Sequence, residues 1–425
     1  MKREFEKFIE ALHEGVVPAT GCTEPVAVAY GAAVCAKYLP SKKVDKIDVH
    51  VSLNIMKNAM AVMVPGTKEP GLQIAASAGA LVGNPNAKLK VISKIKNSDL
   101  PEIKTLAHSG KVKVSLAKVD DDLYVDVTVV SGKDSVTVYI ADDHTNIFKI
   151  VKNDQILYEK DRPKPHAKSA LKLYMQTQKF ENIWDFAMEI PLEKIAFMKK
   201  SADLNVALSK EGLTNSYGMN LGRSLVEDSG KATLENQILT YTVAASDARM
   251  GGATLPAMSN SGSGNQGISA TVPVWVVAKE NNSSEEKLIR ALTLSHLTAI
   301  YIHAFLPVLS AFCAADSAAM GASVGACYLL GGDFETASMS IKNMAGDSVG
   351  MVCDGAGCSC AMKVASSVSS MYRGMKLAMK GIVVPSSNGL VCNDVDETIR
   401  GIGELGSQGL KETDPVILDI MMNKS

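Results

Sequence analysis

The sequence predicts an α+β fold, in which a mainly helical domain packs with a smaller α+β domain. Between about residues 43 and 151, stretches rich in Val and Ile are separated by short polar turns, as is typical of strands. After Arg162-Pro-Lys-Pro165 the pattern becomes helical almost throughout, and Ala, Gly, Ser and Met dominate. At 425 residues and 45.1 kDa the chain has room for one to three domains.

Two helices are predicted to precede the strands. Residues 2–14 place four large apolar side chains on one face at spacings of three and four. A second helix is predicted to begin at Thr23, with Pro25 in its first turn, and to run to Tyr38. Small side chains along this second helix would allow close packing against a neighbouring helix.

The remaining elements follow from the same periodicities. Strands are predicted at Val44–Leu53, Lys88–Ile95, Lys111–Ala117, Leu123–Val130, Ser135–Ile140 and Asn146–Val151, with a helix at Gly71–Leu81. Helices are predicted at 167–178, 181–188, 192–210, 232–249, 268–280, 284–305, 307–330, 333–347 and 360–379. We therefore expect residues 41–160 to form the α+β domain, and residues 1–40 together with 161–425 to form the helical domain.

Composition and charge exclude several classes of protein. The net charge is −1, and the lysines and arginines are scattered, so nucleic acid is not an expected partner. The start of the chain lacks an apolar signal core, and the longest apolar run, Ile268–Ala278, is too short to span a bilayer. A cytoplasmic location without a membrane partner is expected. Eight cysteines in 425 residues favour metal or catalytic use over a disulfide framework.

Cys22 lies just before the predicted start of the second helix. Unpaired amides and the positive end of the helix dipole are predicted there, and both would stabilise a thiolate and lower its pKa. Such a thiolate could act as a base or a nucleophile. The alternative is a small buried core residue, because free cysteines are often buried.

Cys313, Cys353 and Cys360 are separated by 40 and 7 residues, which differs from the C-x2-C spacing of ferredoxins and zinc sites. Three thiolates can hold an iron–sulfur cube and leave its fourth iron open, as a Lewis acid. Two glycines near Cys353 would let the chain wrap closely around such a cluster. Cys358 is a competing ligand, and the spacing alone is also compatible with thiols that share no metal.

Two further segments are candidates for binding a small anion or an amine. Gly262-Ser-Gly-Asn-Gln-Gly267 matches G-x-G-x-x-G, but a poor strand precedes it, so a dinucleotide fold is not favoured. Two interpretations of this segment remain open: an anion nest that holds a carboxylate, or a plain connection between helices. Asn54, Lys57 and Asn58 follow a predicted strand, where a cap or turn explains them as well as substrate binding does. His303 is interpreted as a core histidine.

Five motifs in order resemble the L-cysteine desulfidase family, which is related to the α-chain of the iron–sulfur L-serine dehydratases. They are Gly21-Cys-Thr-Glu-Pro25, Lys57-Asn58, Ser259-Asn-Ser-Gly-Ser-Gly-Asn-Gln-Gly267, Val352-Cys-Asp-Gly-Ala356 and Cys360-Ala-Met-Lys363. The resemblance extends over essentially the whole chain. It implies a lyase that carries out α,β-elimination on L-cysteine to give hydrogen sulfide, pyruvate and ammonia.

The resemblance also implies a site, carried by the helical domain. One [4Fe-4S] cluster per chain would be held by Cys313, Cys353 and Cys360, with Cys22 as the base and no pyridoxal phosphate. The candidate substrate-binding residues are Lys57, Asn58, Ser261, Ser263 and Asn265. An L-serine dehydratase and a non-catalytic iron–sulfur or thiol sensor remain as alternatives. The expected partner is a small amino acid, and a homo-oligomer is compatible with the sequence.

Overall fold

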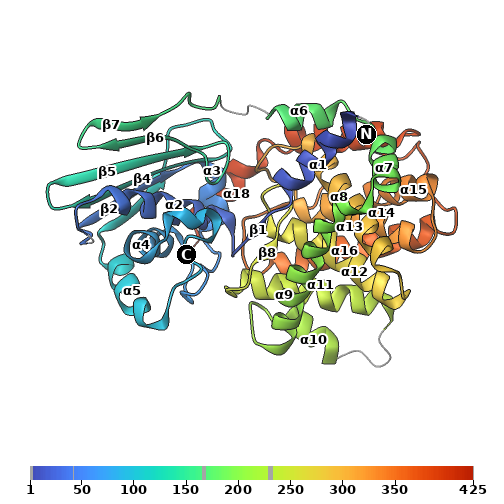
Figure 1. Ribbon diagram of the computed structural model, residues 1–425, viewed down its shortest axis with the longest axis horizontal. Coiled ribbons are helices and arrows are strands. Elements are labelled where there is room, and N and C mark those ends of the chain that lie inside the picture. The colour runs from blue at the N-terminus through green and yellow to red at the C-terminus, as the bar shows by residue number, and fades with distance from the viewer. Residues whose placement is uncertain (1–2, 42, 165–168, 228–232, 425) are drawn as a thin grey trace.

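The computed structural model describes residues 3–41, 43–164, 169–227 and 233–424. Two units lie side by side: a mixed sheet with its covering helices, and a larger helical unit (Figure 1). This confirms the predicted α+β fold with a mainly helical part. The predicted first residues of three helices, at 2, 167–168 and 232, lie outside the described ranges.

The sheet has six strands in the order β3-β2-β4-β5-β6-β7. β2 and β3 are parallel, and every other neighbouring pair is antiparallel. Alternate valines, such as Val125, Val127 and Val129, are fully buried and form the core with the helices that cover one face. The strands are β2 Lys46–Val51, β3 Val112–Leu116, β4 Tyr124–Ser131, β5 Asp134–Ala141, β6 Ile147–Lys152 and β7 Gln155–Glu159.

The covering helices are α2 (Thr23–Tyr38), α4 (Leu72–Val82) and α5 (Leu100–His108). α2 and α4 pack backbone against backbone, since a Cβ on Gly79 would lie 2.1 Å from the carbonyl oxygen of Ala29. Small residues in both helices permit this approach, as the sequence predicts for α2.

The first two helices belong to different cores. The prediction assigns residues 1–40 to the helical domain. α1 (Arg3–Gly15) packs there through Phe5 and Phe8, whereas α2 lies in the core of the sheet unit. The chain therefore crosses from the helical unit to the sheet unit between Gly15 and Thr23.

The helical unit is built largely from helices with small residues on their packing faces. Its last helix, α18 (Thr413–Met422), returns to the sheet unit and packs on α3 (Leu53–Ala59), as Figure 1 shows. The others are α6 Ala170–Gln176, α7 Phe180–Glu189, α8 Leu192–Ile195, α9 Lys199–Thr214, α10 Leu221–Glu227, α11 Leu234–Met250, α12 Gly264–Glu280, α13 Glu285–Ala304, α14 Ala314–Leu329, α15 Phe334–Ala345, α16 Cys360–Ala378 and α17 Val395–Glu404.

Some predicted elements differ from the structure, and several short ones, namely β7 and helices α3, α5, α10, α17 and α18, were not predicted. The strand predicted at Lys88–Ile95 is wrong, because a 3₁₀ helix ends at Lys90 and turns follow it, in which two adjacent residues, Val91 and Ile92, are both buried. The helix predicted from residue 307 begins only at Ala314. The edge strand β7 was not predicted, since all its residues are exposed and no alternation marks it.

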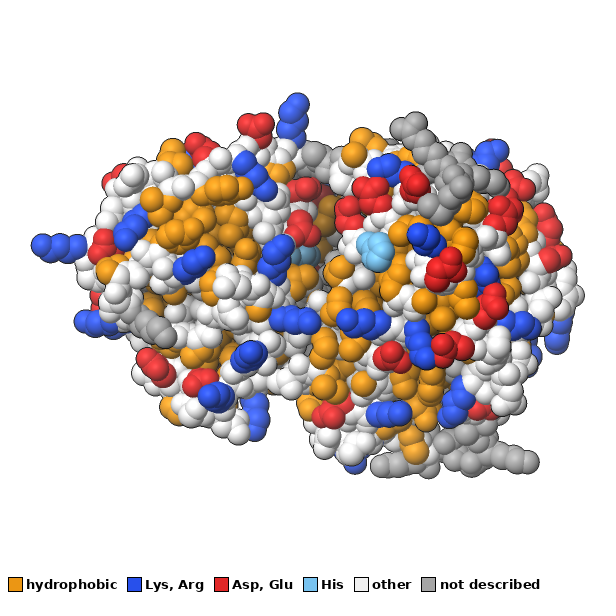
Figure 2. All heavy atoms as spheres, in the orientation of Figure 1, with side chains coloured by type: hydrophobic (Ala, Val, Ile, Leu, Met, Phe, Trp, Pro, Cys, Tyr) orange, Lys and Arg blue, Asp and Glu red, His pale blue; other side chains and the backbone are white. Residues whose placement is uncertain are grey.

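Charged side chains of both signs are interspersed on the face drawn in Figure 2. Within the ranges given above, no helix combines the length and the apolar character needed to cross a bilayer.

Candidate functional site

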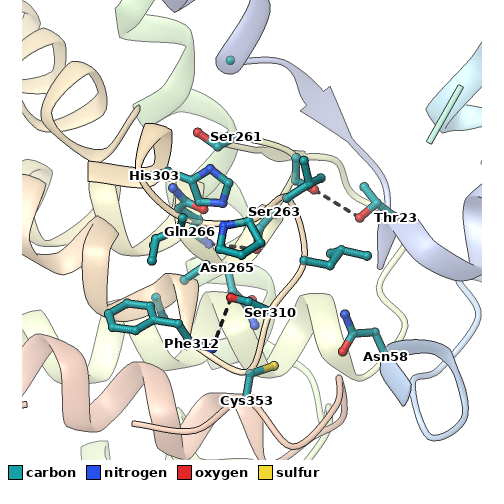
Figure 3. A pocket seen from close by; sticks show the side chains of 18 of the residues that line it. Thr23, Asn58, Ser261, Ser263, Asn265, Gln266, His303, Ser310, Phe312 and Cys353 are labelled. Carbon is teal, nitrogen blue, oxygen red and sulfur yellow. Dashed lines mark hydrogen bonds between the residues drawn. The ribbon is translucent and has the colours of Figure 1, made fainter. Parts of the chain in front are cut away.

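A cavity of about 340 Å³ is lined by residues of both units. In Figure 3 the sulfur of Cys353 lies below the hollow, Asn58 lies beside it, and Ser263 and Asn265 lie above. The lining residues that matter for chemistry are Cys22, Glu24, Asn58, His144, Arg249, Ser261, Ser263, Asn265, His303, Cys313, Cys353, Cys360 and Lys363. The cavity thus collects all four cysteines that were predicted to be functional.

A two-stranded sheet brings Cys22 next to the serine-rich loop. β1 (Pro18–Ala19) pairs antiparallel with β8 (Ala257–Met258), immediately before each of these segments. Beyond the sheet, the hydroxyl of Thr23 donates a 3.1 Å hydrogen bond to the carbonyl oxygen of Gly262. Segments almost 240 residues apart along the chain are therefore held together by backbone pairing.

Gly21 sets the direction of the chain at Cys22. Its φ is +73°, and a Cβ there would lie 2.1 Å from Cγ of Pro65, so both conformation and space require glycine. Cys22 is then the N-cap residue of α2, and its side chain is buried.

Cys22 Sγ donates a 2.9 Å hydrogen bond to Oε2 of Glu24. Burial, and next the negative charge of Glu24, raise the pKa of Cys22 well above its usual value, and the opposing effect of Arg249 is smaller. The predicted lowering of this pKa by the helix terminus is therefore wrong, because desolvation outweighs the helix dipole. At neutral pH Cys22 rests as a thiol.

Glu24 is the buried anion of this part of the site. Oε1 accepts a 3.1 Å hydrogen bond from Nδ2 of Asn58, and Oε2 accepts that of Cys22. Burial alone would raise the pKa of Glu24, but the nearby imidazole of His144 and the Cys22 hydrogen bond outweigh it and hold this pKa below its usual value. The carboxylate is ionised at neutral pH.

Cys313 and Cys353 lie on paired segments. An isolated antiparallel bridge joins Phe312 to Val352, one residue before each cysteine. The backbone N–H of Cys353 also donates a 2.7 Å hydrogen bond to the carbonyl oxygen of Ala311. This pairing brings together the segments that carry two thiols 40 residues apart, and both thiols line the cavity.

Cys360 completes the set as the first residue of α16, and it packs in the same small cluster as Cys22. Burial first, and then the charge of Cys353, raise the pKa of Cys313. Burial likewise raises the pKa of Cys360 to about 11, with a further contribution from Cys353. The thiols are thus near enough to interact electrostatically. Cys358, the competing ligand, does not line the cavity.

A cluster requires a different arrangement from a single metal ion. Among the described side chains, no group of three or more His, Cys, Asp or Glu residues could hold one ion. A cubane binds each thiolate on a separate iron, so its ligands stand farther apart than those of one ion. Three soft thiols that line one cavity are a donor set that fits an iron–sulfur cluster.

Lys57 is fully buried and does not line the cavity. Its ammonium donates to the carboxylate of Asp414 on α18 and, at 3.0 Å, to the carbonyl oxygen of Cys353. Gly355 lies close by with a φ of +101°, and a Cβ there would be 2.6 Å from the carbonyl oxygen of Lys57. In the structure Lys57 thus joins α3, α18 and the cysteine loop.

The other four candidate substrate-binding residues line the cavity: Asn58, Ser261, Ser263 and Asn265. Ser261 has a φ of +47°. Ser263 caps α12 by accepting a 3.4 Å hydrogen bond from the backbone N–H of Gln266. Asn265 Oδ1 accepts a 3.3 Å hydrogen bond from Ser246. The first amides of α12 therefore lie at this edge of the cavity, as an anion nest requires.

Sequence reasoning did not identify three cavity residues: Glu24, His144 and Arg249. Glu24 and Arg249 stand among Ala, Val, Ser and Thr in helices that are buried on most sides, and a charged residue in such a helix is a usable signal. His144 carried no signal, because it lies in a polar turn. His303 also lines the cavity, and burial lowers its pKa to about 3, so it is neutral.

Comparisons with known proteins agree with the motifs. Residues 88–419 match the serine dehydratase alpha chain family. The chain is 59% identical to a UPF0597 protein of Latilactobacillus sakei subsp. sakei, with 100% of both chains covered. It is 46% identical to a UPF0597 protein of Chromobacterium violaceum, covering 99% of this chain and 98% of the relative. A UPF0597 protein of Actinobacillus pleuropneumoniae serotype 3 is also 46% identical, covering 100% and 98%.

The family match places the protein in a class of lyases. The chain belongs to a family related to the L-serine dehydratase alpha chain, which confirms the relationship that the motifs predicted. The serine dehydratase alpha-chain family uses an iron–sulfur cluster.

Proposed function

We propose that the protein is an iron–sulfur-dependent lyase that eliminates hydrogen sulfide from L-cysteine and leaves pyruvate and ammonia. The observation that carries the proposal is the shared cavity, which is lined by Cys22 and Glu24 together with Cys313, Cys353 and Cys360. A proton-accepting pair and a thiol set for a cluster are the two parts that an assisted elimination needs.

Cys313, Cys353 and Cys360 would hold the cluster. When bound, a [4Fe-4S] cluster with an open iron supplies a Lewis acid that draws charge from the leaving group. The buried Lys57 supports this set indirectly, through its hydrogen bond to the carbonyl oxygen of Cys353.

The chain's own contribution is to move a proton. Cys22 becomes a base once its proton has shifted along the hydrogen bond to Glu24. At rest this shift is unfavourable, because the pKa of Cys22 is raised and that of Glu24 is lowered. A positive charge placed closer to Cys22 Sγ than to the Glu24 carboxylate would reduce the difference between the two pKa values, because it would stabilise the thiolate more than the carboxylate.

The bond changes then balance. Cys22 Sγ takes the α-proton, the electrons of the Cα–H bond form the Cα–Cβ double bond, and the Cβ–S bond breaks to release hydrosulfide. The proton held by Glu24 then passes to the hydrosulfide, which leaves as hydrogen sulfide, and Glu24 is again a carboxylate. The resulting 2-aminoacrylate tautomerises to its imine, which water hydrolyses to pyruvate and ammonia. No oxidant or reductant is consumed.

L-serine dehydration is the second candidate, and the match to the serine dehydratase alpha chain family favours it. The same proton transfer would apply, with water as the leaving molecule. The test is to incubate anaerobically purified protein separately with L-cysteine and with L-serine. Sulfide and pyruvate formed together from cysteine support the proposal, whereas pyruvate from serine alone selects the dehydratase. If neither amino acid gives a product, both lyase proposals are overturned and a non-catalytic sensor is favoured.

A further inference from the structure

Two buried charges line the cavity without forming a salt bridge, although Arg249 and His144 lie near enough to Glu24 to help lower its pKa. Arg249 is 4% exposed and Glu24 is 6% exposed. Among the ion pairs of the described residues, none joins them or gives either one another charged partner. A buried charge without an opposite charge in contact is costly, by several kcal/mol in typical proteins. Such charges are retained where a ligand completes them.

The guanidinium of Arg249 is held by neutral groups only. Nη2 donates a 3.0 Å hydrogen bond to the carbonyl oxygen of Gly21, and Nη1 contacts Sδ of Met250, a weak acceptor, at 3.2 Å. Nε is buried and has no hydrogen-bond partner. A Cβ on Gly264 would lie 2.2 Å from Nε, so the absence of a side chain at Gly264 leaves room for the guanidinium.

The buried carboxylate of Glu24 likewise has no salt-bridge partner among the described residues. It accepts hydrogen bonds from Cys22 and Asn58, and the Thr23 hydroxyl, whose one proton is shared with the carbonyl oxygen of Gly262, lies 3.2 Å away; all three donors are neutral. Next to it, Oδ1 of Asn58 is buried without a partner, which leaves a free acceptor at the same wall of the cavity. An ammonium ion between these groups would find one negative charge and one neutral acceptor.

We propose that Arg249 and Glu24 are a recognition pair for the zwitterionic head of an α-amino acid. Arg249 binds the α-carboxylate, which suits the forked geometry of a guanidinium. Glu24, with Oδ1 of Asn58, binds the α-ammonium. This inference rests on the proposed function and deepens it, because it assigns the substrate class to two residues outside the predicted site. Ligands that lack either charged group should bind poorly, because one buried charge stays unpaired.

The test measures binding without turnover. L-alanine has both charged groups but no leaving group, propionate lacks the ammonium, and ethylamine lacks the carboxylate. Titration calorimetry of the anaerobically purified holoprotein with each of the three gives the affinities. We expect L-alanine to bind at least about 10-fold more tightly than propionate or ethylamine, since a hydrogen bond to a charged group contributes about 1.5–3 kcal/mol.

Variants of Arg249 and Glu24 test which charged group of the ligand each residue binds. Arg249→Met should weaken L-alanine binding at least about 10-fold and leave ethylamine binding unchanged. Glu24→Gln should weaken L-alanine binding similarly and leave propionate binding unchanged. Arg249→Lys keeps the positive charge but loses the forked donor geometry of the guanidinium. It replaces Arg249→Met in the test if the Met variant does not fold. Its loss of L-alanine affinity should be smaller, again with none for ethylamine.

Arg290 provides the matched control. It is another largely buried arginine, bound to carbonyl oxygens of Ala187, Met188 and Ile190, and it does not line the cavity. Arg290→Met should lower thermal stability without changing the affinity for L-alanine. Equal losses for all three ligands in the Arg249 and Glu24 variants, or no losses, would overturn the recognition pair. If the expected pattern holds while neither cysteine nor serine is turned over, the elimination is wrong and the recognition pair stands.

Discussion

The thiol of Cys22 donates a 2.9 Å hydrogen bond to the carboxylate of Glu24, and both side chains are buried at the start of α2. The two groups are therefore one acid–base unit, and neither titrates independently of the other. Cys22 does not rest as a thiolate stabilised by the dipole of α2, because burial and the adjacent carboxylate raise its pKa. Activity is expected to depend on both residues.

Cys22→Ala should lower turnover by about 10²–10⁴-fold, since that is the typical cost of removing a positioned base. The brown absorbance of the cluster, near roughly 400 nm, should remain because Cys22 is not among its proposed ligands. The matched control is Cys35→Ala, a second buried cysteine of α2 that does not line the cavity. A fully active Cys22→Ala protein would show that another group takes the α-proton.

Cys353→Ala should lose cluster absorbance and turnover together, because two remaining thiolates would hold the cluster poorly. Cys358→Ala is the matched control, five residues further along the same loop and outside the cavity lining. It should keep both properties. The measurement is iron and sulfide content per chain, with the absorbance spectrum and the thermal unfolding of each variant. Retention of a full cluster in Cys353→Ala would remove Cys353 from the ligand set.

Much of the fold could be predicted from the sequence because its signals are local. The bounds of α2 were predicted to the residue, since Thr23, Pro25 and the small residues that follow all act within a few turns. Its packing partner could not be predicted, because a helix that is small and apolar on nearly all sides has no single apolar face. Only the folded chain shows that α2 covers the sheet.

For the candidate site, the motifs indicated which residues matter but not how they interact. Cys313 and Cys353 come together through a backbone bridge that no spacing reports. Lys57 was predicted to bind substrate because a lysine in a motif suggests an anion, yet its ammonium contacts Asp414 and the cysteine loop. That contact depends on α18, more than 350 residues away along the chain.

Lys57→Met should destabilise the protein by about 3 kcal/mol, because it leaves the carboxylate of Asp414 without its cation. It also removes the hydrogen bond to the carbonyl oxygen of Cys353, so the cluster should be lost faster in air. The double variant Lys57→Met/Asp414→Leu should recover most of the stability but not the cluster lifetime. Urea unfolding and the decay of absorbance measure the two effects. If the double variant is as unstable as Lys57→Met, the ion pair is not the cause.

Asp316 provides a prediction about pH. Burial is the main cause that raises the pKa of Asp316 to about 6, although Ser348 donates a 2.7 Å hydrogen bond to its Oδ1. Between its usual value of 3.8 and about 6, the folded state binds more protons at Asp316 than the unfolded state does. The contribution of this carboxyl group is therefore present at low pH and lost as the pH rises through 6, a change of about 3 kcal/mol.

Asp316→Asn should remove that slope, so its free energy of unfolding relative to the parent should rise between pH 4 and pH 7. Urea unfolding of both proteins at several pH values measures the difference. Asp333→Asn is a control for which the pH dependence of stability should have the opposite sign, because hydrogen bonds from Thr336 lower the pKa of the exposed Asp333. Its carboxylate stabilises the fold above the unfolded pKa, and this stabilisation is lost as the pH falls. Parallel stability curves for Asp316→Asn and the parent would show that the pKa of Asp316 is the same in the folded and unfolded states, with Ser348 and Ser367 compensating for burial.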